Sequence, residues 1–503
     1  MKNGRKIGKG VLYTLSVSFL FLCVALFFAS EWYLFHFGYT GFDSVLATLT
    51  GGLSGTGGSV VWEYLLLGLL PAVLTTGGIV FFCFFRPSRP WKVTVKKKKV
   101  TLYPLHRFFS VWLTYVLAFA FLITAAVRSG FANYVQHRME TTTLFEEYYV
   151  EPTSNRVFFP EHKRNLIYIY LESVETGFFS REKGGAVKPH LMPELYDLAE
   201  ENVNFSHNGS VGGFYSLSGS QWTIGAMVAH SAGIPLKVPF DMDWNDYGSD
   251  GFLPGVITLS DILHREMYYQ VFLLGSDADF GGQKQFYLEH GTDRVCDYYT
   301  APTDGIIDEN YDVWWGMEDA KVYEYAKQEL PKIAAKNQPF AMTLVTIDTH
   351  ETDGYLCDFC EEKYPVQYEN VVACASKQVS RFLDWLKEQD FYENTTVIIC
   401  GDHPTMDDQY VRSHFKKKYD RTVYNCIINA PITSEHTKNR VFSSMDLFPT
   451  TLAALGCTIE GERLGLGTNL FSGVPTLCEE LGKAELNREL KRHSDYYEKF
   501  YGE

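Results

Sequence analysis

Four apolar runs in the larger, C-terminal part of the chain end directly in acidic or histidine residues. Aspartate and serine commonly follow strands because they cap helices and form turns, so one such ending says little about function. Four endings that bear an acid, two of them with a histidine, instead favour a catalytic or metal-binding site. The endings are Glu172-Ser173, Ser276-Asp277, Asp348-Thr349-His350 and Asp402-His403.

Glu172, Asp402 and His403 are suitable ligands for a divalent cation. Two carboxylates and one imidazole leave a coordination position open, as metal-assisted catalysis requires. The chemistry that these residue types support best is phosphoryl transfer, in which the cation neutralises phosphate charge and activates an oxygen nucleophile.

An alcohol nucleophile would complete such a site, because a bound cation lowers the pKa of the hydroxyl and fixes its direction of attack. Thr223 is the candidate, but Ser218 and Ser220 lie in the same segment and spacing alone does not decide among them. Any one of these hydroxyls could instead cap the helix expected to start near Ile224.

The elements that must position these residues alternate between short apolar runs and longer amphipathic stretches. Such alternation predicts a doubly wound α/β sheet, in which ligands bind at the carboxyl ends of the strands. The predicted strands cover 166–171, 269–274, 340–347, 395–400 and 424–429, and the predicted helices include 192–201, 257–267, 322–335 and 371–389.

The N-terminal part contains three apolar runs, at about 11–30, 60–85 and 108–127. Each is long enough to cross a bilayer as a helix. The alternative interpretations, a buried core helix or a cleaved signal peptide, are disfavoured by the length of the runs and their basic flanks. We therefore expect a membrane domain at 1–128, a linker at 129–160, a catalytic domain at 161–490 and a C-terminal tail at 491–503.

The distribution of charge predicts the orientation of this membrane domain. Residues 1–128 contain 13 Lys and Arg against three acids, and most of these bases precede the first run or lie in 86–107. Basic loops stay on the cytoplasmic side. The domain after Arg128 is therefore expected outside the cytoplasm, on a multi-pass protein of the cell membrane.

The domain after Arg128 is strongly acidic, with 32 Lys and Arg against 57 Asp and Glu. Nucleic-acid partners require a basic surface that follows the phosphate backbone. The composition therefore argues against nucleic acid as a partner.

Seven ordered sequence blocks resemble the membrane-anchored branch of the alkaline phosphatase and sulfatase superfamily that includes lipoteichoic acid synthases. The blocks at 221–236 and 252–263 favour the phosphoglycerol transferase I group within that branch. The blocks are YLES at 170–173, QWTIGAMVAHSAGIPL at 221–236, FLPGVITLSDIL at 252–263, GSDADFGGQKQFYLEHG at 275–291, DTHETDGY at 348–355, GDH at 401–403 and SSMDLFPTTLAALG at 443–456.

The resemblance implies roles for individual residues. It assigns Glu172, Asp402 and His403 as metal ligands together with Thr223, which it also implies is the nucleophile. His350 resembles the histidine that contacts substrate phosphate. The same resemblance places Asp277, Gln283 and Lys284 near the head group of the donor, with the choice between Gln283 and Lys284 left open. One divalent cation is implied, with Mn²⁺ expected first and Mg²⁺ or Zn²⁺ as alternatives.

The activity that the resemblance implies is transfer of phosphoglycerol from phosphatidylglycerol to a glycan or glycolipid, through a covalent phosphothreonine intermediate. A phosphoethanolamine transferase and a phosphodiesterase of the same fold are the alternatives within this class. A non-catalytic scaffold on a decayed enzyme fold is a further alternative. The presence of Glu172, Thr223, Asp402 and His403 argues against it.

Three cysteines of the expected outer domain lie close in sequence: Cys357, Cys360 and Cys374. Outside the cytoplasm a disulfide is favoured over redox or zinc-binding duty. The sequence does not determine the pairing, and it contains no second CxxC that would complete a four-thiolate zinc site.

Overall fold

The structure of the chain is a computed structural model that describes residues 2–37, 58–85, 91–95, 98–102, 107–237 and 251–502. The described residues form two compact units, 2–136 and 137–502, called here the N-terminal and the C-terminal unit. Within the basic segment on which the predicted orientation depends, residues 86–90, 96–97 and 103–106 lie outside the described residues.

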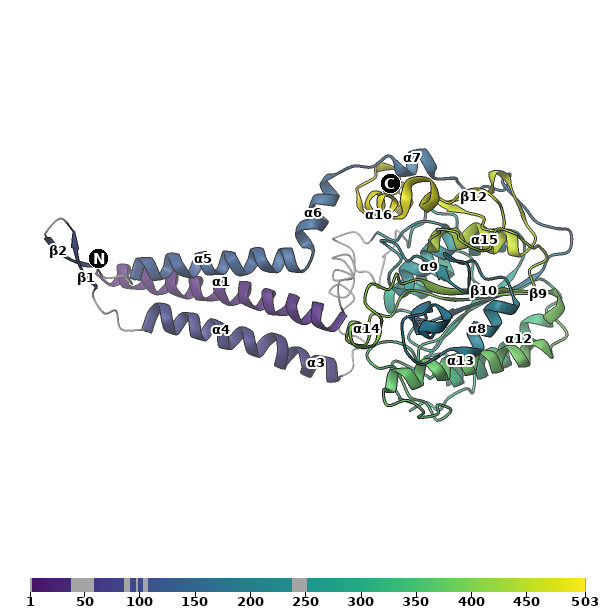
Figure 1. Cartoon of the computed structure of the whole chain (residues 1–503), viewed down its shortest axis with the longest axis horizontal. Helices are drawn as coiled ribbons and strands as arrows, with labels where there is room; N and C mark the ends of the chain where they lie inside the picture. Colours follow the sequence, from purple (N-terminus) through teal and green to yellow (C-terminus); the bar gives the residue numbers. More distant parts are fainter. Residues whose placement is uncertain are drawn as a thin grey trace. The chain divides into compact units, whose positions relative to one another are not determined.

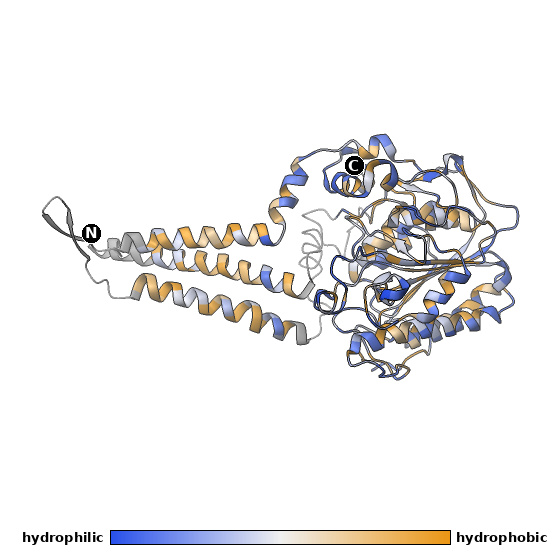
Figure 2. Ribbon diagram, viewed as in Figure 1, coloured by the Kyte–Doolittle hydropathy of each residue, from blue (hydrophilic) through white to orange (hydrophobic). Residues whose placement is uncertain are grey.

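The N-terminal unit consists mainly of apolar helices (Figure 2). Among the residues that the structure describes, three stretches are long and apolar enough to cross a membrane, as predicted: Val11–Phe35, Val61–Phe84 and Ser110–Arg128. The first stretch lies in α1 (Lys2–Phe37) and the third in α5 (Arg107–Arg128). The second is continuous helix made of α3 (Gly58–Tyr64), Leu65–Leu69, α4 (Leu70–Val80) and Phe81–Phe85. Two strands, β1 (Trp91–Val95) and β2 (Lys98–Leu102), pair antiparallel.

The outer surface of these helices is apolar. Trp62, Leu74 and Phe81 each expose about two thirds of their surface, at 67%, 66% and 66%. In water such a surface would cost free energy, whereas lipid solvates it. The guanidinium of Arg128 donates to both carboxylate oxygens of Glu31, at 2.6 and 2.9 Å, and so joins α5 to α1.

The C-terminal unit is built on a mixed sheet that has seven strands among the described residues, in the order β5-β10-β9-β4-β8-β6-β7. Five neighbouring strands are parallel, whereas β10 runs antiparallel to both β9 and β5. The strands are β4 (Asn165–Leu171), β5 (Gly213–Phe214), β6 (Tyr269–Leu274), β7 (Arg294–Cys296), β8 (Phe340–Val345), β9 (Thr395–Gly401) and β10 (Val423–Ile428).

Helices cover both faces of this sheet, with α9 and α15 on one side of β9 and β10 and α12 and α13 on the other (Figure 1). Side chains of β4 alternate between the two apolar cores: Tyr168 packs in the core with α9 and α15, and Ile169 packs in the core with α12 and α13. The helices are α8 (Pro193–Glu201), α9 (Thr223–Ala232), α10 (Leu259–Arg265), α11 (Gln283–Glu289), α12 (Asp319–Ala334), α13 (Gln367–Lys387), α14 (Asp408–His414), α15 (Leu447–Ala454) and α16 (Lys483–Lys491).

Shorter elements complete the chain. Helix α6 contains the boundary between the units, and two small antiparallel pairs, β3 with β11 and β12 with β13, lie outside the main sheet. Their bounds are α6 (Phe131–Met139), α7 (Leu144–Tyr148), α17 (Asp495–Glu498), β3 (Val157–Phe158), β11 (Thr458–Ile459), β12 (Arg463–Leu464) and β13 (Gly467–Thr468).

The predicted α/β fold and all five predicted strands are confirmed, and each predicted helix is present with shifted ends. Two features of the sheet were not predicted. Strands β5 and β7 have two and three residues, too few to show a periodicity. Strand β10 is antiparallel, which an apolar run alone does not reveal, because its burial on both faces is the same in either direction.

Gly401 ends β9 directly before two of the candidate ligands. A Cβ atom at this position would lie 2.0 Å from the carbonyl oxygen of Val174, whereas a Cβ at Gly209 would meet its nearest neighbour only at 4.0 Å. We therefore expect Gly401→Ala to lower the free energy of unfolding by about 1–3 kcal/mol. Urea denaturation checks this, with Gly209→Ala as the matched control, and equal stability of the two variants would contradict the predicted clash.

Candidate active site

Strand register places the first two candidate ligands side by side. β4 and β9 are parallel neighbours, and their last paired residues are Leu171 and Gly401. The residues that follow, Glu172 and Asp402, therefore leave the same edge of the sheet next to each other. This edge is the carboxyl end of the strands, where α/β sheets bind ligands.

Glu172, Asp402 and His403 form a buried cluster whose candidate ligand atoms all lie within 4.8 Å of one another. The Nε2 atom of His403 lies 3.4 Å from Oδ2 of Asp402 and 3.6 Å from Oε1 of Glu172. The three residues expose only 3%, 0% and 3% of their surface for Glu172, Asp402 and His403. Two carboxylates this deeply buried need a cation or a proton as partner.

Hydrogen bonds orient the side chains of Asp402 and His403. Oδ1 of Asp402 accepts from the backbone N–H groups of Ser173 (2.8 Å) and His403 (2.7 Å), whereas Oδ2 has no hydrogen-bond partner in the described part of the chain. His403 lies with Nδ1 3.0 Å from the carbonyl oxygen of Pro404, to which it donates as the Nδ1–H tautomer. Nε2 then keeps its lone pair for a metal. The residues present therefore fit a divalent cation.

The electrostatics of the cluster agree with this fit. Burial, followed by the charge of Glu172, raises the pKa of Asp402 to about 7. Burial alone would lower the pKa of His403, but the carboxylates of Asp402 and Glu172 raise it. The metal-free cluster therefore holds protons, which a divalent cation would displace.

Thr223 is the first residue of α9, and its hydroxyl lies beside the cluster. Its Oγ1 donates to Oε2 of Glu172 at 3.2 Å. The positive end of the helix dipole lies at this residue and favours a negatively charged group there. Ser220 instead donates to the carbonyl oxygen of Leu217 at 2.9 Å. Of the competing hydroxyls, the structure thus brings that of Thr223 to Glu172.

A pocket of about 310 Å³ opens beside Thr223 and Glu172. Of the residues expected near the head group, Asp277, Gln283 and His350 line this pocket. Gln283 is buried, and its Oε1 has no hydrogen-bond partner among the described residues. Lys284 lies outside the lining, and its Nζ is 3.4 Å from Oδ1 of Asp279. The geometry thus favours Gln283 over Lys284 as the residue that faces a ligand.

His350 is held by its backbone neighbour and by an indole ring. Its Nδ1 lies 2.9 Å from the carbonyl oxygen of Glu351, and the Trp315 ring centre lies 4.6 Å from that of the imidazole. Burial lowers the pKa of His350 to about 4. The imidazole is therefore neutral near pH 7, with Nε2 as the acceptor when Nδ1 carries the proton.

Several lining residues were not identified in the sequence. Trp314 and Trp315 precede α12 and flank His350, and Tyr298 and Tyr299 line the same pocket. Their only sequence signal is the pairing of large aromatics in two dipeptides. Because such aromatic pairs more often belong to the hydrophobic core, the sequence did not show that these residues line a pocket.

A buried ion pair next to the segment that follows His403 was also missed. Arg421 pairs with both carboxylate oxygens of Glu175, which is fully buried, and donates to the carbonyl oxygen of Thr405 at 2.6 Å. The backbone N–H of Thr405 donates to the same carboxylate at 3.2 Å. This pair fixes the segment that follows His403.

The fold and the position of this site define the class of protein. Residues 164–457 match the family model described as Sulfatase, so the chain belongs to the sulfatase family. The crystal structure of the lipoteichoic acid synthase LtaP from Listeria monocytogenes has the same fold, with a TM-score of 0.50 and 18% identity over 68% of this chain and 81% of that chain. The alkaline-phosphatase-like fold predicted from the sequence is thereby confirmed.

Curated relatives are named phosphoglycerol transferase I, as the sequence blocks suggested. The protein of that name from Salmonella choleraesuis (strain SC-B67) is 29% identical over 441 residues, 86% of this chain and 53% of that protein. The one from Escherichia coli O6:K15:H31 (strain 536 / UPEC) is 31% identical over 337 residues, 65% of this chain and 41% of that protein. The chain thus spans about half the length of these relatives.

Asp402→Asn tests the metal fit. The amide keeps the oxygen that accepts from Ser173 and His403 but places an NH₂ group where Oδ2 stands. We expect the affinity for Mn²⁺, measured by calorimetry, to fall by about 100-fold or more. The matched control Asp279→Asn changes an exposed acid that hydrogen-bonds no candidate ligand, and it should leave the affinity unchanged.

The raised pKa of Asp402 predicts that the stability of the metal-free protein depends on pH. A carboxyl whose folded pKa lies above its unfolded value stabilises the fold at low pH and loses that contribution as the pH rises through the folded pKa. For Asp402 this contribution to stability is lost between about pH 4 and about pH 7. Thermal unfolding without metal should show it, and Asp402→Asn should lack it. An unchanged pH profile in Asp402→Asn would contradict this account.

Proposed function

We propose that the chain is a membrane-bound phosphoglycerol transferase that moves a phosphoglycerol group from phosphatidylglycerol to a hydroxyl of a glycan or glycolipid. The observation that carries the proposal is the hydrogen bond from Thr223 to Glu172, two residues that line the pocket. The similarity to proteins named phosphoglycerol transferase I supports the choice of group transferred.

Glu172, Asp402 and His403 would hold one divalent cation, with Thr223 as a further ligand through its hydroxyl. Mn²⁺ is the first choice, as the resemblance to lipoteichoic acid synthases implies, and oxygen and imidazole donors would also suit Mg²⁺ or Zn²⁺. When bound, the cation neutralises charge on the phosphate and lowers the pKa of the threonine hydroxyl.

In the first half of the reaction, Thr223 Oγ1 forms a bond to the phosphorus of the lipid donor. The bond from phosphorus to the diacylglycerol oxygen breaks. The proton that the Thr223 hydroxyl gives up balances the one that the diacylglycerol oxygen takes up as diacylglycerol leaves. Glu172 accepts the hydrogen bond of the threonine and so aims the oxygen. The product on the protein is a glycerophosphate ester of Thr223.

In the second half, an acceptor hydroxyl attacks the same phosphorus, the bond from phosphorus to Thr223 Oγ1 breaks, and Oγ1 takes up a proton to restore the threonine hydroxyl. His350 is neutral at physiological pH, so its Nε2 can accept the proton of that hydroxyl. Gln283 and Asp277 offer hydrogen-bond partners for the glycerol hydroxyls, and the ring of Trp315 supplies an apolar wall for a glycerol or sugar carbon face.

The rest of the chain suits a lipid donor and an acceptor outside the cytoplasm. The apolar spans would hold the catalytic domain, proposed as residues 161–490, at the membrane surface where phosphatidylglycerol lies. The basic segment at 86–107 favours an extracytoplasmic site by the positive-inside rule.

One observation favours a second candidate, transfer of phosphoethanolamine by the same residues. Three aspartates line the pocket, Asp277, Asp279 and Asp312, and carboxylates attract the ammonium group of an ethanolamine head group. With water as the acceptor, the same site would act as a phosphodiesterase.

The covalent intermediate distinguishes these functions. We expect the full-length chain in detergent, incubated with Mn²⁺ and phosphatidylglycerol but no acceptor, to gain the mass of glycerophosphate on Thr223, as read by peptide mass spectrometry. Phosphatidylethanolamine should leave no adduct. Thr223→Ala should lower turnover by about 10⁴-fold or more, because Ser173, which also donates to Glu172 (2.7 Å), does not line the pocket.

Ser218→Ala is the control for this experiment, because Ser218 lies in the same segment but outside the pocket lining. It should form the adduct as the unaltered chain does. An adduct on Thr223→Ala would contradict the proposed nucleophile, and an ethanolamine phosphate adduct would favour the second candidate over the first.

A further inference from the structure

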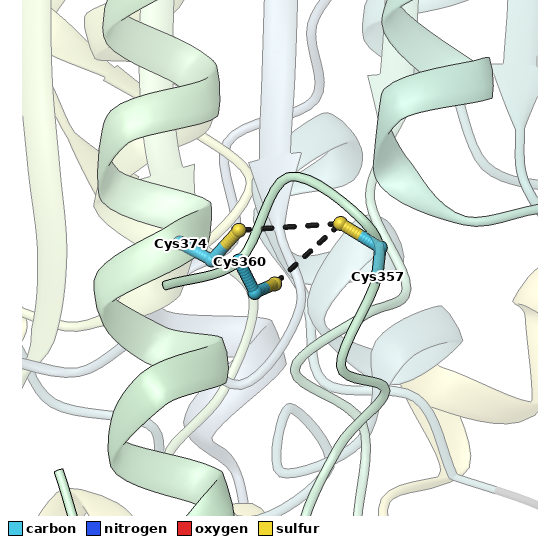
Figure 3. Close-up of side chains that lie close together, drawn as sticks. All are labelled: Cys357, Cys360 and Cys374. Atoms are coloured by element: carbon cyan, nitrogen blue, oxygen red, sulfur yellow. Dashed lines mark hydrogen bonds between the residues drawn. The ribbon is translucent and has the colours of Figure 1, made fainter. Parts of the chain in front are cut away.

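A second cluster of metal-binding residue types lies in the C-terminal unit, away from the catalytic cluster. Cys357 and Cys360 come from the segment after β8, and Cys374 comes from α13 (Figure 3). Their sulfur atoms point toward one another and all lie within 4.8 Å. All three are free thiols in the structure.

The spacing of the sulfur atoms is that of ligands around one ion. The sulfur of Cys357 lies 3.5 Å from that of Cys360 and 4.0 Å from that of Cys374. Two thiolates that bind a tetrahedral zinc ion at about 2.3 Å are separated by roughly 3.8 Å. A disulfide would bring two of these atoms to about 2.05 Å and leave the third without a partner.

The surroundings donate hydrogen bonds to sulfur. The side-chain amide of Gln378 lies 3.7 Å from the sulfur of Cys357 and 3.6 Å from that of Cys374. The backbone N–H groups of Phe359 and Cys360 also interact with the Cys357 sulfur. Such donors stabilise thiolate charge and orient metal ligands. Cys357 and Cys374 are buried, whereas Cys360 is partly exposed.

We propose that Cys357, Cys360 and Cys374 form a binding site for one thiophilic divalent cation, zinc being the best match to three thiolates at this spacing. Binding displaces the three thiol protons into solvent. A water molecule would complete the tetrahedron on the exposed side of Cys360. The sequence favoured a disulfide here because it does not reveal that three sulfurs meet at one point.

The consequence of such an ion concerns the segment that carries His350. Between β8 and α13 this segment is already tied to the helix, since Tyr368 donates to the carbonyl oxygen of Thr349 (3.0 Å) and Gln367 to that of Gly354 (3.0 Å). An ion that joins Cys357 to Cys374 adds a further tie between this segment and α13. The site is therefore a structural clamp that holds a wall of the catalytic pocket.

Cobalt substitution tests the site without reference to activity. The full-length chain, reduced and in detergent, should show a thiolate-to-cobalt charge-transfer band when titrated with Co²⁺, with one sulfur-bound ion per chain. The catalytic cluster contains no sulfur ligand, so Asp402→Asn should keep the band. The double variant Cys357→Ala/Cys374→Ala should lose it, and its affinity for Zn²⁺ at this site should fall by at least about 100-fold.

Cys457→Ala is the matched control, because Cys457 is a buried thiol of the same unit outside the cluster. It should keep the band. The proposal is overturned if the reduced, folded chain shows no charge-transfer band, or if the band survives in the double variant. Circular dichroism of each variant establishes that it is folded. If the unaltered chain shows the charge-transfer band but transfers no phosphoglycerol, the result contradicts the proposed function and leaves the thiolate site supported.

Discussion

The register between β4 and β9 is the constraint on which the rest of the site depends. It places Glu172 and Asp402 side by side at one sheet edge, in surroundings that exclude water. Burial and, after it, repulsion from the Glu172 carboxylate raise the pKa of Asp402, so two unpaired carboxylates at this place carry a free-energy cost. A divalent cation removes the repulsion, so the same feature that destabilises the metal-free cluster favours metal binding. Thr223 lies at the N-terminus of α9, where the positive end of the helix dipole favours an anion next to its hydroxyl.

Much of this arrangement could be predicted from the sequence, because buried strands have a simple signal. The five strands of six or seven residues were recognised as short apolar runs, and the candidate ligands were recognised because they follow those strands. Thr223 is different: spacing left it equal to Ser218 and Ser220, and only the resemblance to a known family favoured it. The structure shows why spacing failed, since the direction of each hydroxyl depends on where α9 begins.

Features that depend on contacts distant in sequence could not be predicted. Arg421 and Glu175 pair across 246 positions, and neither has a local signal. Gln283 and Lys284 are adjacent, so only the start of α11 decides which one lines the pocket. The thiol cluster combines a local CxxC with a helix residue, and its chemistry depends on the sulfur distances rather than on the motif. Among the described residues, the C-terminal unit thus carries two clusters of candidate metal ligands of different donor type, one of oxygen and nitrogen and one of sulfur.

Anomalous X-ray diffraction from crystals of the full-length chain grown with Mn²⁺ tests the central claim most directly. The account predicts one manganese peak bonded to a carboxylate oxygen of Glu172, a carboxylate oxygen of Asp402, Nε2 of His403 and Oγ1 of Thr223, each at about 2.0–2.3 Å. A manganese peak held by other residues, or one held by the first three with the hydroxyl of Thr223 turned away in the presence of a phosphate ester, would contradict it.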